Sequence, residues 1–147
     1  MDAYERLRQY RDAYRYAIEC AHVVDDARHS QLRSPKYDRV SRSSGMSGLD
    51  YTMEKIEAAD RKYLKAKKKV LRLLNELADM VDELDDYQEQ KVIYLRHIYV
   101  MDWTDIGKSM GISDRTAQRI HGRAMTALQH IMKTKEEDLN ERTQSKG

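Results

Sequence analysis

Residues 101–133, MDWTDIGKSMGISDRTAQRIHGRAMTALQHIMK, give the clearest prediction of the fold. Asp102 is suited to cap a short helix of about eight residues, because its carboxylate can accept hydrogen bonds from the first turn and Asp105 follows near the helix N-terminus. Gly111 stands where a helix commonly ends in the left-handed conformation. Ser113 is then suited to cap a second, longer helix. A short helix, a tight turn containing glycine and a longer helix together predict a helix-turn-helix.

The apolar residues of this stretch fit two packed helices. Ile106 and Met110 lie four residues apart and predict the buried side of the short helix, and Ile112 is placed to fill the turn. Gly107 lies inside the short helix, where glycine costs about 1 kcal/mol against alanine, so its use predicts that another helix crosses closely there. The buried face predicted for the second helix comprises Ala117, Ile120, Ala124, Leu128 and Ile131.

The residues outside these buried faces predict a contact with duplex DNA. Arginine and glutamine make bidentate hydrogen bonds to guanine and adenine edges in the major groove, which favours Arg115, Gln118 and Arg119 as base-reading residues. Hydroxyl groups, lysine and helix N-termini suit phosphate contacts, and Arg123 is expected to join them. The whole predicted DNA-binding set is Thr104, Lys108, Ser113, Asp114, Arg115, Thr116, Gln118, Arg119 and Arg123. The alternative is an ordinary three-helix bundle whose arginines only solubilise it.

The preceding segment, DYQEQKVIYLRHIYV (86–100), predicts a further packed helix. Trp103 is expected in the core or as a wedge between helices, and His121 and His130 are expected as surface or capping groups. The broad apolar face predicted for residues 86–100 comprises Val92, Ile93, Leu95, Ile98 and Tyr99.

The stretch QEQKVIYLRHIYVMDWTDIGKSMGISDRTAQRIHGRAMTAL resembles region 4 of bacterial sigma-70-type factors and the related LuxR-type DNA-binding domains. The likeness covers about residues 87–130 and lies in the leading Leu/Tyr-Arg helix, W-T-D-I-G, M-G-I-S and the R-x-x-x-R-I-H-G-R-A series. With the N-terminal helices and the Ser/Gly loop, the whole chain is similar to small phage and prophage regulators of the ArpU type. The resemblance implies DNA binding in transcription control and contact with RNA polymerase. The chain departs from it in lacking a region-2-like segment and in having Gly107 where alanine is more usual.

Two seven-residue apolar repeats precede this region and predict two long helices of roughly 30 and 36 residues. The first repeat comprises Leu7, Tyr10, Tyr14, Ala17, Ala21 and Val24. The second comprises Leu49, Met53, Ile56, Asp60, Tyr63, Lys67, Val70, Leu74, Leu77, Val81 and Leu84. Asp60 and Lys67 interrupt the second repeat, either as devices that fix register or partner number, or as an exposed part of the stripe.

A polar loop, SPKYDRVSRSSGMSG (34–48), separates the two repeats and holds the only proline of the chain. It is long enough for the helices to fold back as an antiparallel hairpin. Ser47 or Asp50 is suited to cap the second helix. The alternative is that each helix pairs with a copy from another chain, as a coiled-coil homodimer.

Charge is segregated along the 147 residues although the formal net charge is only +2. Residues 61–72 carry seven basic side chains and no acidic one, and residues 73–90 carry seven acidic side chains and no basic one. Residues 91–135 carry eight basic and three acidic side chains. If the second long helix paired with another copy, the basic residues 61–72 of one copy would lie against the acidic residues 73–90 of the other. Exposed ion pairs of this kind contribute only about 0–1 kcal/mol each.

Composition excludes several classes of protein. Cys20 is the single cysteine, which excludes an intramolecular disulfide and a zinc site built from cysteines. We expect Cys20 to be a small buried apolar residue. An apolar run of about 18 residues is absent, so we expect a cytoplasmic protein. The resemblance to phage and prophage regulators implies that the cell is a bacterial host. The acidic residues have no nucleophile, phosphate loop or metal-binding pattern beside them, which predicts neither catalysis nor a cofactor nor a metal site.

The sequence therefore predicts an all-α chain with a helical hairpin or coiled coil over 1–86, a helix-turn-helix domain over 87–135 and a polar tail over 136–147. The expected function is sequence-specific binding of double-stranded DNA in transcription control, with residues 113–130 as the recognition helix. The alternatives are a small terminase-like DNA-packaging protein and a coiled-coil adaptor that binds polymerase or a sigma factor without touching DNA.

Overall fold

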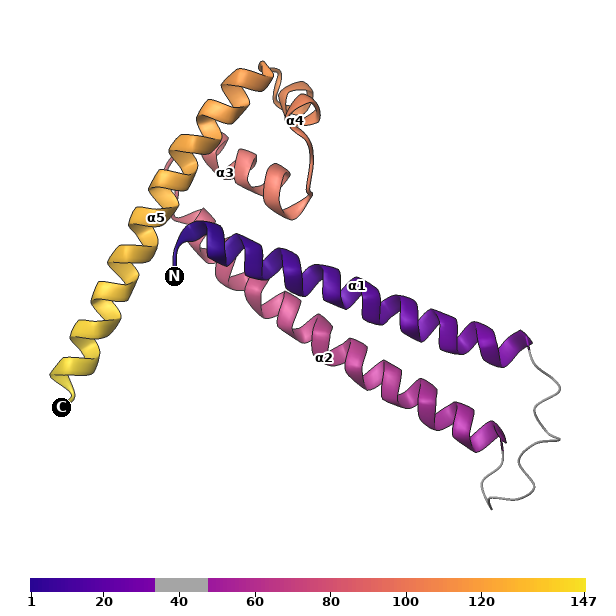
Figure 1. Ribbon diagram of the computed structural model, residues 1–147. Helices are drawn as coiled ribbons and strands as arrows, with labels where there is room; N and C mark the ends of the chain where they lie inside the picture. Colours follow the sequence, from indigo (N-terminus) through magenta and orange to yellow (C-terminus); the bar gives the residue numbers. More distant parts are fainter. Residues whose placement is uncertain (34–47) are drawn as a thin grey trace. The chain divides into compact units, whose positions relative to one another are not determined.

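The computed structural model describes residues 1–33 and 48–147, and over these residues the chain is helical without strands. The predicted all-α class is confirmed. Residues 34–47 of the loop expected over 34–48 and the cap expected at Ser47 lie outside the described residues, whereas Gly48 belongs to a helix. The elements are α1 (Ala3–Arg33), α2 (Gly48–Asp82), α3 (Tyr87–Ile93), the π-helical segment η2 (Tyr94–Ile98), α4 (Trp103–Met110) and α5 (Asp114–Ser145) (Figure 1).

The chain forms two compact units. One, here called the heptad unit, is Asp12–Arg72, and the other, here called the composite unit, joins Met1–Arg11 to Leu73–Gly147. The composite unit therefore contains the first turns of α1 and the last turns of α2 together with α3, η2, α4 and α5. No helix in the described ranges is long and apolar enough to cross a membrane.

In the heptad unit, α1 and α2 run side by side and antiparallel (Figure 1). The guanidinium of Arg28 donates to both carboxylate oxygens of Asp60 at 3.2 Å, and the ammonium of Lys62 lies 5.9 Å from the ring centroid of Tyr16. Asp60 interrupts the apolar repeat of α2, and its carboxylate is paired with Arg28 and remains partly exposed to solvent. The buried residues of this unit are Ala13, Ala17, Cys20, Val24, Ile56, Ala66 and Val70.

The buried stripe differs from the predicted one by single-residue shifts. Tyr14 is 43% exposed and Ala13 is buried beside it, and Lys67 is exposed whereas its neighbour Ala66 is buried. Cys20 likewise takes the place predicted for the next residue in the chain. A straight α-helix drifts by about 20° per heptad from a strict 3.5-residue repeat, so neighbouring positions exchange roles along a long helix. Small side chains are buried at these shifted positions.

The composite unit has its core where α3, α4 and α5 pack together. A fully buried cluster of Val92, Ile106, Ala117 and Ile120 brings together α3, α4 and α5. Packed against it are Leu95, Met101, Trp103, Met110 and Ile112, so Met110 and Ile112 behave as predicted. On α5 the buried residues are Ala117, Ile120, Ala124, Met125, Leu128 and Met132, whereas the predicted Ile131 is only half-buried.

The prediction of a buried apolar face over residues 86–100 is correct for Val92 and Ile93, which are buried. It is wrong for Tyr99, which is 70% exposed. The reason is the π-helical turn η2, in which the Tyr99 N–H donates to the Tyr94 carbonyl five residues earlier at 3.0 Å. A wider turn rotates the next residue off the face that an α-helix would give it. Val100 then adopts a φ of 55°, which is rare for a β-branched residue.

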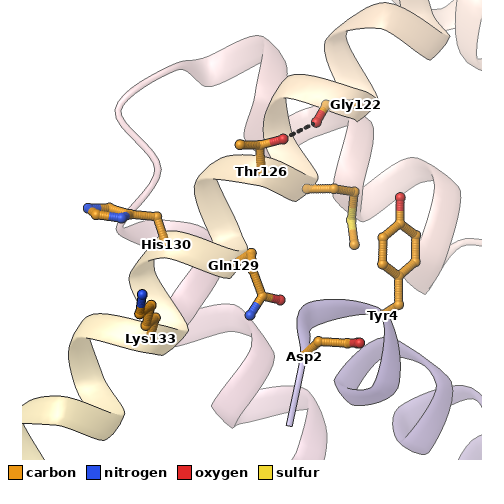
Figure 2. A pocket seen from close by; sticks show the side chains of 8 residues that line it. Asp2, Tyr4, Gly122, Thr126, Gln129, His130 and Lys133 are labelled. Atoms are coloured by element: carbon orange, nitrogen blue, oxygen red, sulfur yellow. Dashed lines mark hydrogen bonds between the residues drawn. The ribbon is translucent and has the colours of Figure 1, made fainter.

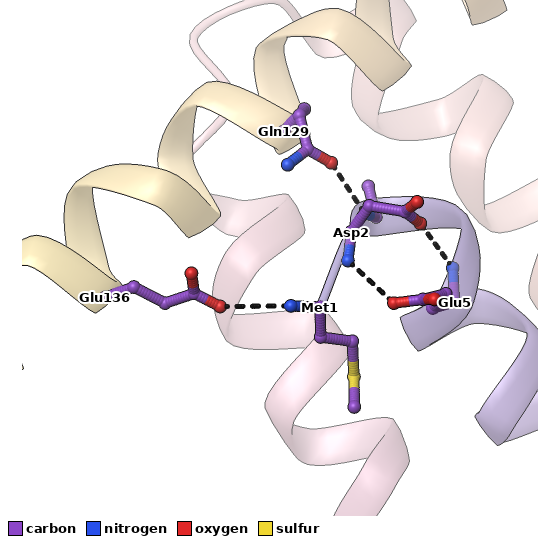
Figure 3. Close-up of polar contacts among 6 residues, drawn as sticks. Met1, Asp2, Glu5, Gln129 and Glu136 are labelled. Atoms are coloured by element: carbon purple, nitrogen blue, oxygen red, sulfur yellow. Dashed lines mark hydrogen bonds and ion pairs between the residues drawn. The ribbon is translucent and has the colours of Figure 1, made fainter.

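The first turn of α1 is anchored within the composite unit (Figure 3). Asp2 and Glu5 form a capping box, since Asp2 Oδ1 accepts from the Glu5 N–H at 2.8 Å and Glu5 Oε2 accepts from the Asp2 N–H at 3.1 Å. The Ala3 N–H donates to Gln129 Oε1 of α5 at 2.8 Å. Because α5 continues to Ser145, residues 136–145 of the expected polar tail are the end of this helix.

Candidate nucleic-acid interface

The turn between α4 and α5 has the geometry that the sequence predicts. Asp102 accepts from the Asp105 N–H at 2.8 Å at the start of α4, which is eight residues long. Gly111 ends α4 with φ 69° and ψ 34°, in the left-handed region. Ser113 accepts from the Thr116 N–H at 3.1 Å and caps α5. Both predicted caps and the predicted helix end are confirmed.

Gly107 lies at a close approach to the turn and to Asp114, the first residue of the crossing helix α5, as the sequence predicts. A Cβ atom at Gly107 would lie 2.7 Å from the carbonyl oxygen of Ile112 and 3.2 Å from Oδ1 of Asp114. The Ile112 N–H in turn donates to the Gly107 carbonyl at 2.9 Å. The missing side chain therefore sets how tightly the turn folds back on α4.

Four of the predicted DNA-binding residues hold the turn together. The Thr104 hydroxyl donates to Asp114 Oδ2 at 3.0 Å and so joins α4 to the first residue of α5. The Ser113 hydroxyl donates to the Thr116 hydroxyl at 2.8 Å. These hydrogen bonds lie at the surface, and they fix the angle at which α5 leaves the turn.

The other five predicted residues project from the surface. Arg115, Gln118, Arg119 and Arg123 are exposed on the first three turns of α5, and Lys108 is exposed on α4. The arginines recur every four residues and therefore lie on one face of the helix. In the described part of the chain, none of them forms an ion pair with a carboxylate. From residue 115 to residue 135 the sequence has five arginines and lysines and no acidic residue.

A layer of aromatic and cationic side chains joins η2, α4 and α5. Nε2 of His97 lies 2.8 Å from Nε2 of His121, and their rings stack with centroids 5.0 Å apart. Trp103 meets the His121 ring edge-on at 5.1 Å, and the Arg96 guanidinium lies 4.5 Å from the Trp103 ring centroid. Trp103 is thus the wedge between helices that the sequence predicts, whereas His121 belongs to a half-buried pair.

Electrostatics favours neutral rings in this histidine pair. Burial, followed by the charge of His121 and by Arg11 and Arg96, lowers the pKa of His97 to about 4. Burial and then Arg96 lower the pKa of His121. One neutral ring donates its Nε2–H and the other accepts, which ties α5 to the segment that precedes α4. The two residues are 24 positions apart, so no local pattern in the sequence announces the pair.

Within the described ranges no group of three or more histidine, cysteine or acidic side chains is placed to hold a metal ion. The comparisons with known proteins found no matching family model, no matching curated protein and no matching solved structure.

Proposed function

We propose that this protein binds duplex DNA in a sequence-specific manner and acts as a transcriptional regulator of the phage or prophage type. The observation that carries the proposal is the exposed face of α5, on which Arg115, Gln118 and Arg119 project without a carboxylate partner from a helix capped by Ser113. An α-helix fits the major groove, and these two residue types are the ones that best read guanine and adenine there.

The proposed roles follow from position along the helix. Arg115, Gln118 and Arg119 lie near the N-terminus of α5 and would contact base edges, as recognition helices do. Arg123, one turn later, and Lys108 on α4 would contact phosphates. The Thr104–Asp114 and Ser113–Thr116 hydrogen bonds would hold the N-terminus of α5 at the correct angle to the duplex.

Two further partners belong to the same proposal. RNA polymerase is the first of these partners, and its basis is the resemblance to sigma region 4. A homodimer through the heptad helices would place two recognition helices on one duplex and would require half-sites separated by a whole number of helical turns. A footprint over a single short half-site would contradict the dimer and leave the DNA-binding proposal intact.

The test begins with selection of a preferred site from a random duplex library, followed by fluorescence anisotropy on that site. Arg119→Ala should weaken binding to the selected site by about 1–3 kcal/mol and relax its sequence preference. The matched control is Arg142→Ala, which removes an exposed arginine from the far end of the same helix. If Arg119→Ala binds the selected site as tightly as the unmodified protein, the recognition role of this face is wrong.

A further inference from the structure

The exposed face of α5 continues beyond the predicted recognition residues into a hollow of about 560 Å³ (Figure 2). It is lined by Gly122, Met125, Thr126, Gln129, His130 and Lys133 of α5 and by Asp2 and Tyr4 near the start of α1. All these residues belong to the composite unit. The spacing of 115, 119, 123, 126, 130 and 133 keeps them on one helix face, so the hollow prolongs the arginine face.

Gly122 is the first unusual feature of this hollow. It lies in the interior of a 32-residue helix, where glycine is the poorest residue apart from proline. A Cβ atom added there would meet nothing within 4 Å, in contrast to Gly107. Packing inside the protein therefore gives no reason for this glycine. Close approach of a ligand to the backbone is the other common use of glycine.

The charge of the hollow is the second feature. His130 and Lys133 are exposed on its α5 side, and the intervening helix up to Lys135 carries no acidic residue. Gln129 uses its Oε1 to accept from the Ala3 N–H, which leaves its amide NH₂ as a donor. The one carboxylate at the rim, that of Asp2, is engaged at 2.8 Å in capping α1. The free amide donor of Gln129 and the cationic side chain of Lys133 thus suit an anion.

We propose that this hollow seats a phosphate of the DNA backbone, an inference that rests on the proposed function. The distance along α5 from Arg115 to Lys133 is about 27 Å, at 1.5 Å per residue. The major groove is only about 12 Å wide, so a helix that enters it by its first turns reaches a phosphate strand with its later ones. Lys133 and Gln129 donate to the phosphate, and the absent side chain at Gly122 lets the strand lie against the helix.

Substitutions at Gly122 separate this role from a role in folding. Gly122→Ala and Gly122→Gln place better helix formers at the position, so both variants should melt at a higher temperature than the unmodified protein. Both should nevertheless bind duplex DNA more weakly, and Gln more so than Ala because its longer side chain fills the hollow. Higher stability combined with lower affinity is an outcome that a purely structural role cannot produce.

Lys133→Gln gives a second measurement that is independent of the glycine. On a fixed duplex, loss of one phosphate contact should reduce the slope of log affinity against log salt by about 0.9. The matched control is Lys135→Gln on the same helix, since Lys135 pairs with Glu83 at 2.6 Å and does not line the hollow. The control should leave the slope unchanged.

These variants are compared with the unmodified protein and Arg119→Ala on the selected duplex. If Arg119→Ala weakens binding while Gly122→Gln and Lys133→Gln bind as the unmodified protein does, the phosphate seat is overturned and the proposed function stands. The hollow would then suit an acidic segment of a protein partner. If the unmodified protein binds no duplex, the proposed function and this inference both fail.

Discussion

The α4–α5 turn and the heptad unit are held together by different kinds of contact. The turn depends on directional hydrogen bonds from Asp102, Ser113 and Thr104 and on a glycine that nothing larger can replace without a clash. The heptad unit depends on a stripe of mostly small apolar side chains, and its ion pair between Arg28 and Asp60 is exposed to solvent. A directional hydrogen bond requires a particular side chain at a particular position. Apolar burial is not directional, so the buried position can shift to a neighbouring residue.

This contrast makes the single tryptophan a useful probe. Trp103 packs against the core of the composite unit, so its fluorescence reports unfolding there, whereas far-ultraviolet circular dichroism reports all helices. Comparison of the two signals in denaturant separates the behaviour of the two units.

The largest effect is expected at Ile106, which is fully buried in the cluster beneath the turn. Ile106→Ala should lower the free energy of unfolding by about 2–5 kcal/mol, because it leaves a cavity in a closely packed core. Urea denaturation followed by Trp103 fluorescence measures the loss. A loss below 1 kcal/mol would contradict the packing described for this cluster.

The adjacent residues Ala66 and Lys67 test the register of the heptad stripe. Ala66 is 6% exposed, so Ala66→Lys should destabilise the heptad unit by about 1–3 kcal/mol through overpacking. Lys67→Ala should change stability by less than about 0.5 kcal/mol, since Lys67 is exposed. Circular dichroism in urea measures both. The reverse order of effects would restore the heptad register that we predicted from the sequence.

A smaller effect is expected from the cap of α5. Ser113→Ala removes the acceptor of the Thr116 N–H and should cost about 1 kcal/mol, with Trp103 fluorescence as the readout. Ser109→Ala, on the exposed surface of α4, is the control and should have little effect. Equal effects of the two variants would show that the cap does not stabilise the turn.

The last effect is the pH dependence that arises from the histidine pair. The pKa of His97 is about 4 in the folded protein, below its ordinary value of 6.5, so the unfolded chain binds more protons between these values. The free energy of unfolding is therefore highest above pH 6.5 and decreases as the pH falls toward 4. The slope is less than about 1.4 kcal/mol per pH unit, because solvent screens the half-buried rings.

His97→Gln should flatten this dependence, and His22→Gln, an exposed position on α1, should not. Urea midpoints from Trp103 fluorescence at several pH values give the comparison. An unchanged slope in His97→Gln would mean that other groups cause the acid sensitivity.

The sequence allows the local chemistry of the candidate interface to be predicted, residue by residue. Asp102, Gly111 and Ser113 form their hydrogen bonds with residues three or four positions away in the sequence, so their roles follow from short patterns. The features that were not predicted depend on contacts between distant segments, such as His97 with His121 and Ala3 with Gln129. The π-helical turn before Tyr99 also lacks a local pattern. The exposed arginines were predicted, but the internal hydrogen bonds of Thr104 and Asp114 were not.

The central claim, that the arginine face of α5 binds duplex DNA, is tested most directly by the salt dependence of binding. Anisotropy of a random duplex of about 25–30 base pairs is titrated with the protein between about 50 and 200 mM salt. We predict affinity that falls steeply with salt, and a flatter slope when Arg115, Arg119 and Arg123 are replaced by alanine. No binding at tens of micromolar protein in low salt would contradict the claim and favour a protein-binding adaptor.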